Sequence, residues 1–173
     1  MRLVTASLCI TTFVLAATIG LGAQGAAKKA APAKAAPAAA APAHSMATPG
    51  EMKWGPAPPA LPAGAQIAVL DGDPGKAAPF VMRLKFPDGY KIAPHWHSGA
   101  ENITTVSGTF MMGLGDKYDA AAMHALPAGS FAMMPKEGRH YATAKGETIV
   151  QIHGMGPFDV NYINPADDPS KKK

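Results

Sequence analysis

Three histidines and one glutamate are the residues of this chain whose types and spacing best suit chemistry. His95 and His97 are one residue apart, Glu101 follows four positions after His97, and His140 comes from a second stretch. Imidazole and carboxylate groups bind divalent transition metals, so these four side chains are a candidate ligand set. The set does not name the metal, because iron, manganese, zinc, nickel and copper all accept such ligands.

The spacing of the first three residues favours strands. Side chains alternate faces along a strand, so His95 and His97 are expected to point the same way. Residues 98–100 offer a turn, after which the chain can re-enter a strand with Glu101 on the ligand side. We expect this strand to reverse at Gly108. A helix is a poor alternative, because positions two apart do not share a helix face.

The second stretch predicts another short strand followed by a turn. The apolar run 131–134 is typical of a buried strand, and Pro135 ends it. A turn through Glu137 and Gly138 then leads to His140.

Together the two stretches resemble the paired motifs of the cupin superfamily. The first motif is matched without a gap by Gly89, His95, His97, Glu101 and Gly108. The second is matched by Gly129, Pro135 and His140, and it departs at Glu137 and Ala144, where the family has glycine and asparagine. The resemblance covers residues 64–164.

This resemblance implies an all-β fold, the double-stranded β-helix or jelly-roll barrel, with the site in its mouth. It also implies that His95, His97, Glu101 and His140 are the metal ligands. The sequence favours an all-β domain independently, because short apolar runs alternate with clusters of Gly, Pro, Asp and Asn. The predicted strands are 67–70, 80–86, 103–106, 109–114, 131–134 and 148–153, with a helical turn within 118–123. We place the cupin domain at 51–165.

The two ends of the chain read differently. Residues 1–23 have the layout of a secretory signal peptide, and an uncleaved anchor is the alternative. Residues 24–50 are rich in Ala, Pro and Lys and predict a disordered tether. Residues 166–173 predict a basic, disordered tail. The single cysteine, Cys9, lies in the signal, so the mature chain would form no intramolecular disulfide.

The charge argues against a nucleic-acid partner. The formal net charge is +4. The excess lies in the terminal segments, and the domain is close to neutral, at about −1. No basic stripe interleaved with aromatic residues is present in the sequence. We expect a small-molecule partner and an exported protein, periplasmic or secreted, without stable membrane insertion after cleavage. A homodimer stays open.

Two functions are favoured at this point over a third, a structural storage-like cupin, which the single short domain disfavours. The first is a metal-dependent oxidoreductase, similar to a dioxygenase, acting on a small oxygen-rich molecule. There Glu101 would act as base, and His153, on a late strand, would carry protons; a hydrogen-bonded core histidine is the alternative for His153. The second is a non-catalytic module that binds or senses a metal or ligand in the cell envelope. The sequence leaves open whether the protein is an enzyme, because fold does not fix function.

Overall fold

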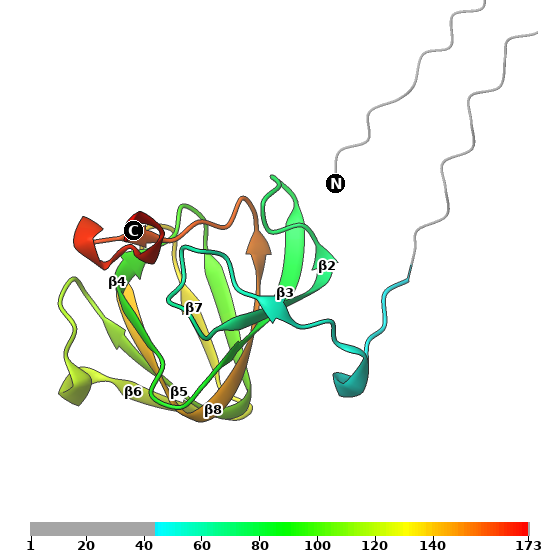
Figure 1. The fold of residues 1–173 in the computed structure, drawn as a ribbon, viewed down its shortest axis with the longest axis horizontal. Coiled ribbons are helices and arrows are strands. Elements are labelled where there is room, and N and C mark those ends of the chain that lie inside the picture. The colour runs from blue at the N-terminus through cyan, green and yellow to red at the C-terminus, as the bar shows by residue number, and fades with distance from the viewer. Residues whose placement is uncertain (1–43, 173) are drawn as a thin grey trace, which may run out of the picture. The chain divides into compact units, whose positions relative to one another are not determined.

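A computed structural model describes residues 44–172, which form a curled antiparallel sheet (Figure 1). The prediction of an all-β fold is confirmed. The strands are β1 (Gly55–Pro56), β2 (Gln66–Gly72), β3 (Pro79–Phe86), β4 (Lys91–Trp96), β5 (Glu101–Leu114), β6 (His124–Pro127), β7 (Phe131–Met134), β8 (His140–Met155) and β9 (Asn161–Tyr162). Four short 3-10 turns accompany them: η1 (Pro49–Glu51), η2 (Ala120–Ala122), η3 (Pro165–Asp167) and η4 (Pro169–Lys171). The helical turn expected within 118–123 is present as η2.

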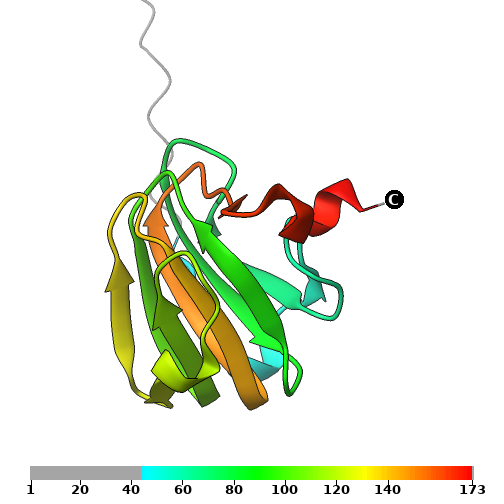
Figure 2. The same cartoon turned by 90° about the vertical axis from the view of Figure 1, so that its left-hand side faces the viewer.

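Two long strands, β5 and β8, hold the sheet together and make it curl (Figure 2). Residues 102–105 of β5 pair with residues 150–153 of β8, and in this layer β7 pairs with β5 and β3 pairs with β8. Residues 109–114 of β5 pair with residues 140–145 of β8, and in this second layer β6 pairs with β5 and β4 pairs with β8. Each long strand therefore serves both layers of the barrel.

Gly108 marks a bend in β5, and the expectation that the chain reverses there was wrong. The pairing register between β5 and β8 shifts on both sides of Ser107. Gly108 has a φ of 73°, and a Cβ at this position would lie 2.3 Å from the carbonyl oxygen of Glu147. A glycine thus lets the strand bend as a bulge and continue, because only a residue without Cβ fits this backbone and this approach.

The core follows the alternation that the sequence predicts for β3. Phe80, Met82, Leu84 and Phe86 are all buried, while Arg83 and Lys85 point to the other face. The ring of Phe86 stacks on Tyr90 and Phe110, with centroids 4.9 and 5.9 Å apart. Full burial of one such apolar side chain contributes about 1.5–3 kcal/mol.

A segment before β2, residues 57–65, lies against one end of the barrel, and we call it the strap. Its two ends are joined by a hydrogen bond from Ala57 N to Ala65 O, 3.1 Å long. Two tyrosine hydroxyls from elsewhere in the chain hold its middle. Tyr90 Oη donates to Pro62 O at 2.5 Å, and Tyr162 Oη donates to Ala60 O at 2.7 Å.

The ends of the described range are more ordered than the sequence suggests. Two features lie in the last residues assigned to the tether. The hydroxyl of Ser45 donates a hydrogen bond to the carbonyl of Leu70, and turn η1 begins at Pro49. The segment expected to be a disordered tail forms turns η3 and η4, because the side chains of Asn164 and Asp168 accept hydrogen bonds from backbone N–H groups of each turn. The predicted signal peptide lies outside the described residues. Within 44–172 there is no helix of the length and apolarity needed to span a bilayer.

Candidate metal centre

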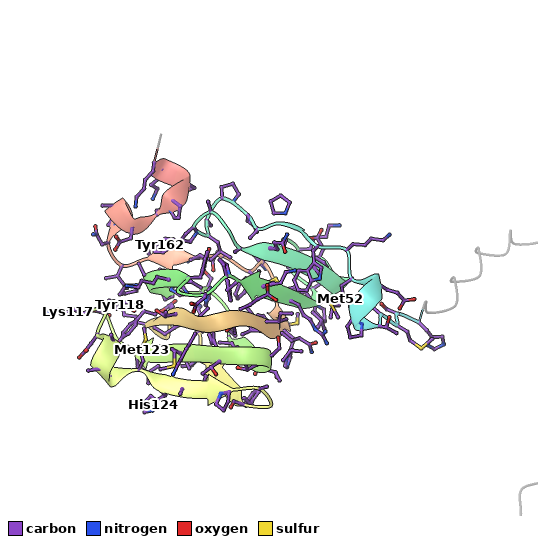
Figure 3. All side chains as sticks on the ribbon, turned by 60° about the horizontal axis from the view of Figure 1, so that its bottom comes forward. Met52, Lys117, Tyr118, Met123, His124 and Tyr162 are labelled. Atoms are coloured by element: carbon purple, nitrogen blue, oxygen red, sulfur yellow. The ribbon has the colours of Figure 1, made fainter. Side chains whose placement is uncertain are left out.

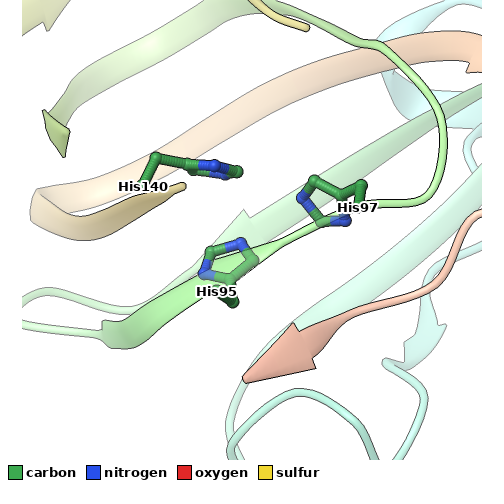
Figure 4. Close-up of side chains that lie close together, drawn as sticks. All are labelled: His95, His97 and His140. Carbon is green, nitrogen blue, oxygen red and sulfur yellow. The ribbon is translucent and has the colours of Figure 1, made fainter. Parts of the chain in front are cut away.

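The structure brings the four predicted ligands together at the end of β4 and at the starts of β5 and β8. His95 lies near the end of β4 and His97 just after it, Glu101 begins β5, and His140 begins β8. His95 and His140 are direct partners in the β4–β8 pairing. The three imidazoles converge (Figure 4), and one nitrogen from each lies within 4.8 Å of the others. All four side chains are buried, with 2–4% of each residue exposed.

The unusual turn before His140 still delivers this residue to the site. Glu137, which replaces the expected glycine, has a φ of 61° and so adopts the left-handed conformation that glycine favours. Its N–H donates to the carbonyl of His97 at 2.9 Å, and Gly138 N–H closes the turn on Pro135 O at 2.8 Å. Hydrogen bonds to the ligand segment thus hold a strained residue in the position of the glycine.

Backbone carbonyls fix the orientation of all three rings. Nδ1 of His95 lies 2.8 Å from Ala93 O, and Nδ1 of His140 lies 3.0 Å from Gly138 O. Nδ1 of His97 makes the same kind of bond to Asp159 O. A carbonyl only accepts, so each Nδ1 carries a proton, and in the neutral form of each ring Nε2 would present a lone pair. Such a partner on the second ring nitrogen is the usual support of a metal-binding histidine.

Glu101 lies against two of these rings in a way that calls for a cation. Its Oε2 is 3.3 Å from Nε2 of His97 and 3.3 Å from Nε2 of His140. Nε2 of His97 and Oε2 of Glu101 are nevertheless buried without a hydrogen-bond partner. An ion bound at about 2.1 Å would place neighbouring ligand atoms about 3.0–3.4 Å apart for octahedral and tetrahedral angles, which is the spacing found here. The residues present therefore fit a divalent metal ion.

Burial and neighbouring charges set the protonation of the cluster. Burial lowers the pKa of His95 to about 3, and the rings of His140 and His97 act in the same direction. Burial also disfavours charge on His97, but the Glu101 carboxylate outweighs it and raises the pKa of His97 above 6.5. Burial would raise the pKa of Glu101, but the rings of His140 and His97 lower it instead. Glu101 is thus a carboxylate and His95 a neutral ring at pH 7, the forms that bind metal.

The loop between β8 and β9 supports His97 from two sides, a contact that the sequence analysis did not predict. The ring of Phe158 stacks on His97 with centroids 4.4 Å apart. The carboxylate of Asp159 accepts hydrogen bonds from Ser98 N at 2.7 Å, from the Ser98 hydroxyl, and from Asn161 Nδ2 at 2.8 Å. These bonds hold the carbonyl of Asp159 against Nδ1 of His97. The adjoining Gly156-Pro157 pair is the one sequence signal of a loop here.

His153 does not lie at the site, which corrects the expectation that it carries protons there. In the last part of β8 the buried side chains are those of Val150 and Ile152, so His153 points to the opposite face. It is half-buried and does not line the cavity that holds the ligands. His124 is exposed on β6 (Figure 3) and does not line the cavity that holds the four predicted ligands.

The four predicted ligands lie in the wall of a cavity of about 130 Å³. The strap contributes Pro58, Ala60 and Leu61 to this wall, and the β8–β9 loop contributes Phe158 and Asp159. The rest of the wall consists mainly of apolar side chains from the barrel strands. Three buried imidazoles and a carboxylate that can hold a metal ion therefore face a space lined mainly by apolar side chains.

Comparison with known proteins supports the fold. No family model and no curated protein matches the chain. Among solved structures, the polyketide cyclase RemF from Streptomyces resistomycificus is similar, with a TM-score of 0.61 and 13% identity over 75% of this chain and 92% of that one. A putative acetylacetone dioxygenase from Methylibium petroleiphilum PM1 has a TM-score of 0.57 and 18% identity over 76% and 88%. An RmlC-like cupin from Shewanella frigidimarina NCIMB 400 has a TM-score of 0.51 and 15% identity over 65% and 91%.

Proposed function

Since the chain has the cupin fold, we propose that it binds one divalent transition metal and uses it as an oxidoreductase, similar to a dioxygenase, acting on a small molecule. His95, His97, Glu101 and His140 would hold the ion. One observation carries the proposal: Nε2 of His97 and Oε2 of Glu101 are buried 3.3 Å apart with no hydrogen-bond partner. Leaving such groups unpaired costs about 1–3 kcal/mol each, and a cation between them removes that cost.

The residues around the ion define what the site would do. A redox-active ion such as iron or manganese would supply one-electron exchange with dioxygen and polarise a donor oxygen of the substrate. The four ligands leave positions open on an ion that prefers six. Glu101 lies beside His97 and His140 in the cavity wall, and on leaving the ion its carboxylate would accept a proton from a molecule in the cavity. The apolar wall would exclude water from the reacting groups. The putative acetylacetone dioxygenase among the similar structures supports this class of chemistry.

The non-catalytic alternative, in which a metal or ligand is only bound or sensed, is favoured by a different observation. The four ligand side chains are at most 4% exposed, which limits the exchange of substrate and product. Turnover separates the two functions. We propose that the iron- or manganese-loaded protein consumes dioxygen with at least one member of a panel of diketones, catechols and small acids. Metal binding without consumption on any of them would favour the binding module.

Metal analysis tests the site itself. We expect His95→Ala and Glu101→Ala to lose the metal that the wild type retains after purification and dialysis. His124→Ala is the matched control, because it removes an exposed histidine outside the cluster. A metal present at 1,000 times its Kd would stabilise the wild type by about 4 kcal/mol. Equal metal content and equal stability in all four proteins would contradict the assignment.

We also propose, from the sequence alone, that residues 1–23 direct export and are removed, which would place the protein in the periplasm or outside the cell. N-terminal sequencing of the protein purified from its native cells tests this. A native N-terminus at Met1 would contradict cleavage and favour the anchor.

A further inference from the structure

The wall of the ligand-bearing cavity is apolar almost everywhere except at the metal-binding cluster. It is built by strands from both layers of the barrel, by the strap and by the β8–β9 loop. Typical members are Leu61, Met82, Phe86, Phe110, Ile152 and Phe158. A molecule in this space would meet hydrocarbon on most sides.

The polar groups of the wall are gathered at one end. Among the described residues that line the cavity there is no lysine or arginine, and the side chains that can ionise are the four predicted ligands and Asp159. The carboxylate of Asp159 already accepts hydrogen bonds from Ser98 and Asn161. The cavity thus offers one place for a polar group, next to the three imidazoles and Glu101.

The volume limits the size of the occupant. An engineered apolar cavity of about 150 Å³ in another protein binds benzene, which has six carbon atoms. The cavity of about 130 Å³ found here is slightly smaller. It therefore has room for about six non-hydrogen atoms.

We propose that this cavity selects a small, mainly apolar molecule with a single oxygen-bearing end, which faces the metal-binding cluster. The proposal rests on the proposed metal site and narrows its substrate. It replaces the sequence-based expectation of an oxygen-rich substrate, because hydroxyl groups along the body of the molecule would lie against Phe, Leu and Ile. Each hydroxyl left unpaired in this way weakens binding by about tenfold or more.

A matched pair of acids tests the proposal without requiring turnover. Butanoate and 3-hydroxypropanoate have the same number of non-hydrogen atoms and differ by one methyl group replaced with a hydroxyl. We would titrate each into zinc-loaded protein in a calorimeter, with malonate as a third ligand that has a charge at both ends. Zinc is redox-inert, so the readout is affinity alone. We expect butanoate to bind about tenfold more tightly than 3-hydroxypropanoate, and malonate to bind most weakly.

A cavity variant adds a second readout. Leu61→Ala enlarges the cavity on the side of the strap. Because the side chain of Leu61 is only half-buried, the barrel core should stay intact. We expect hexanoate to gain affinity relative to butanoate in this variant, with zinc content unchanged. The proposal is overturned if 3-hydroxypropanoate or malonate binds zinc-loaded wild type as tightly as butanoate, or if none of the three binds. It is overturned too if the ratio of hexanoate to butanoate affinity in Leu61→Ala equals that of the wild type.

The zinc content distinguishes this failure from failure of the proposed function. Protein that binds zinc but shows a flat or reversed ligand series would refute the apolar substrate class and leave the metal site standing. Protein that binds no zinc would refute the metal site, and this inference would fall with it.

Discussion

Replacing Asp159 with alanine should weaken metal binding although this side chain is not a ligand. The backbone carbonyl of Asp159 accepts the Nδ1 proton of His97, and its carboxylate holds that carbonyl in place through bonds to Ser98 and Asn161. Asp159→Ala keeps the carbonyl but removes the bonds that position it. His97 would then be free to turn away from Glu101.

The size of the effect follows from the number of bonds lost. Removing a partner that orients a metal-binding histidine typically lowers metal affinity by about 10–100-fold, or about 1.4–2.7 kcal/mol. Three hydrogen bonds to the half-exposed carboxylate are lost as well, which should destabilise the metal-free protein by about 1–3 kcal/mol after screening by solvent. For a domain of this size the melting temperature should fall by about 4 °C for each kcal/mol.

The assay separates positioning from a general loss of stability. Calorimetric titration with zinc gives the affinity, and thermal unfolding of the metal-free protein gives the stability. Asp168→Ala is the matched control, because Asp168 also accepts bonds from the N–H and hydroxyl of a serine, Ser170, but lies between η3 and η4. We expect its zinc affinity to equal that of the wild type. Unchanged zinc affinity in Asp159→Ala, or an equal loss in Asp168→Ala, would refute the reasoning.

Three further substitutions test the scaffold. Glu137→Gly should raise stability by about 1 kcal/mol in urea unfolding, because the φ of 61° is strained for glutamate; a loss of stability would contradict this. Gly113→Ala should destabilise by about 3 kcal/mol or more, since its Cβ would lie 2.1 Å from buried Tyr141, whereas Gly55→Ala meets nothing within 4 Å and serves as the control. Tyr162→Phe removes the hydrogen bond to Ala60 in the strap, so it should lower the free energy of unfolding by about 1 kcal/mol and accelerate hydrogen exchange of the strap amides more than that of the β8 amides. Equal acceleration in the strap and in β8 would contradict the idea that this hydroxyl holds the strap.

Strand alternation predicted the ligand cluster because it is a local property. The spacing of His95, His97 and Glu101 alone put them on one face, and the structure buries all three together. The full length of β5 was not predicted. A glycine such as Gly108 usually indicates the end of a strand, but here it lets the strand bend and continue. The wrong expectation for His153 has a similar origin. Alternation along β8 shows which residues share a face, but it does not show which of the two faces points into the barrel.

The supporting loop and the strap could not be predicted from local pattern. Asp159 meets His97 across 62 positions of sequence, and Tyr162 meets Ala60 across 102. Neither contact belongs to a repeating strand pattern, and each depends on how the barrel closes. The sequence therefore predicted which four side chains come together, but not the residues that orient them or cover them.

Strand β8 begins with His140, one of the four predicted ligands, and ends in the opposite layer of the barrel, paired along its length with β3, β4 and β5. His140 cannot leave its place without disturbing strands that belong to the whole fold. A bound ion would therefore leave slowly, because its release would require movement of these paired strands and not of a single side chain. Metal supply in the compartment where the chain folds would then decide which element the protein carries for the rest of its lifetime.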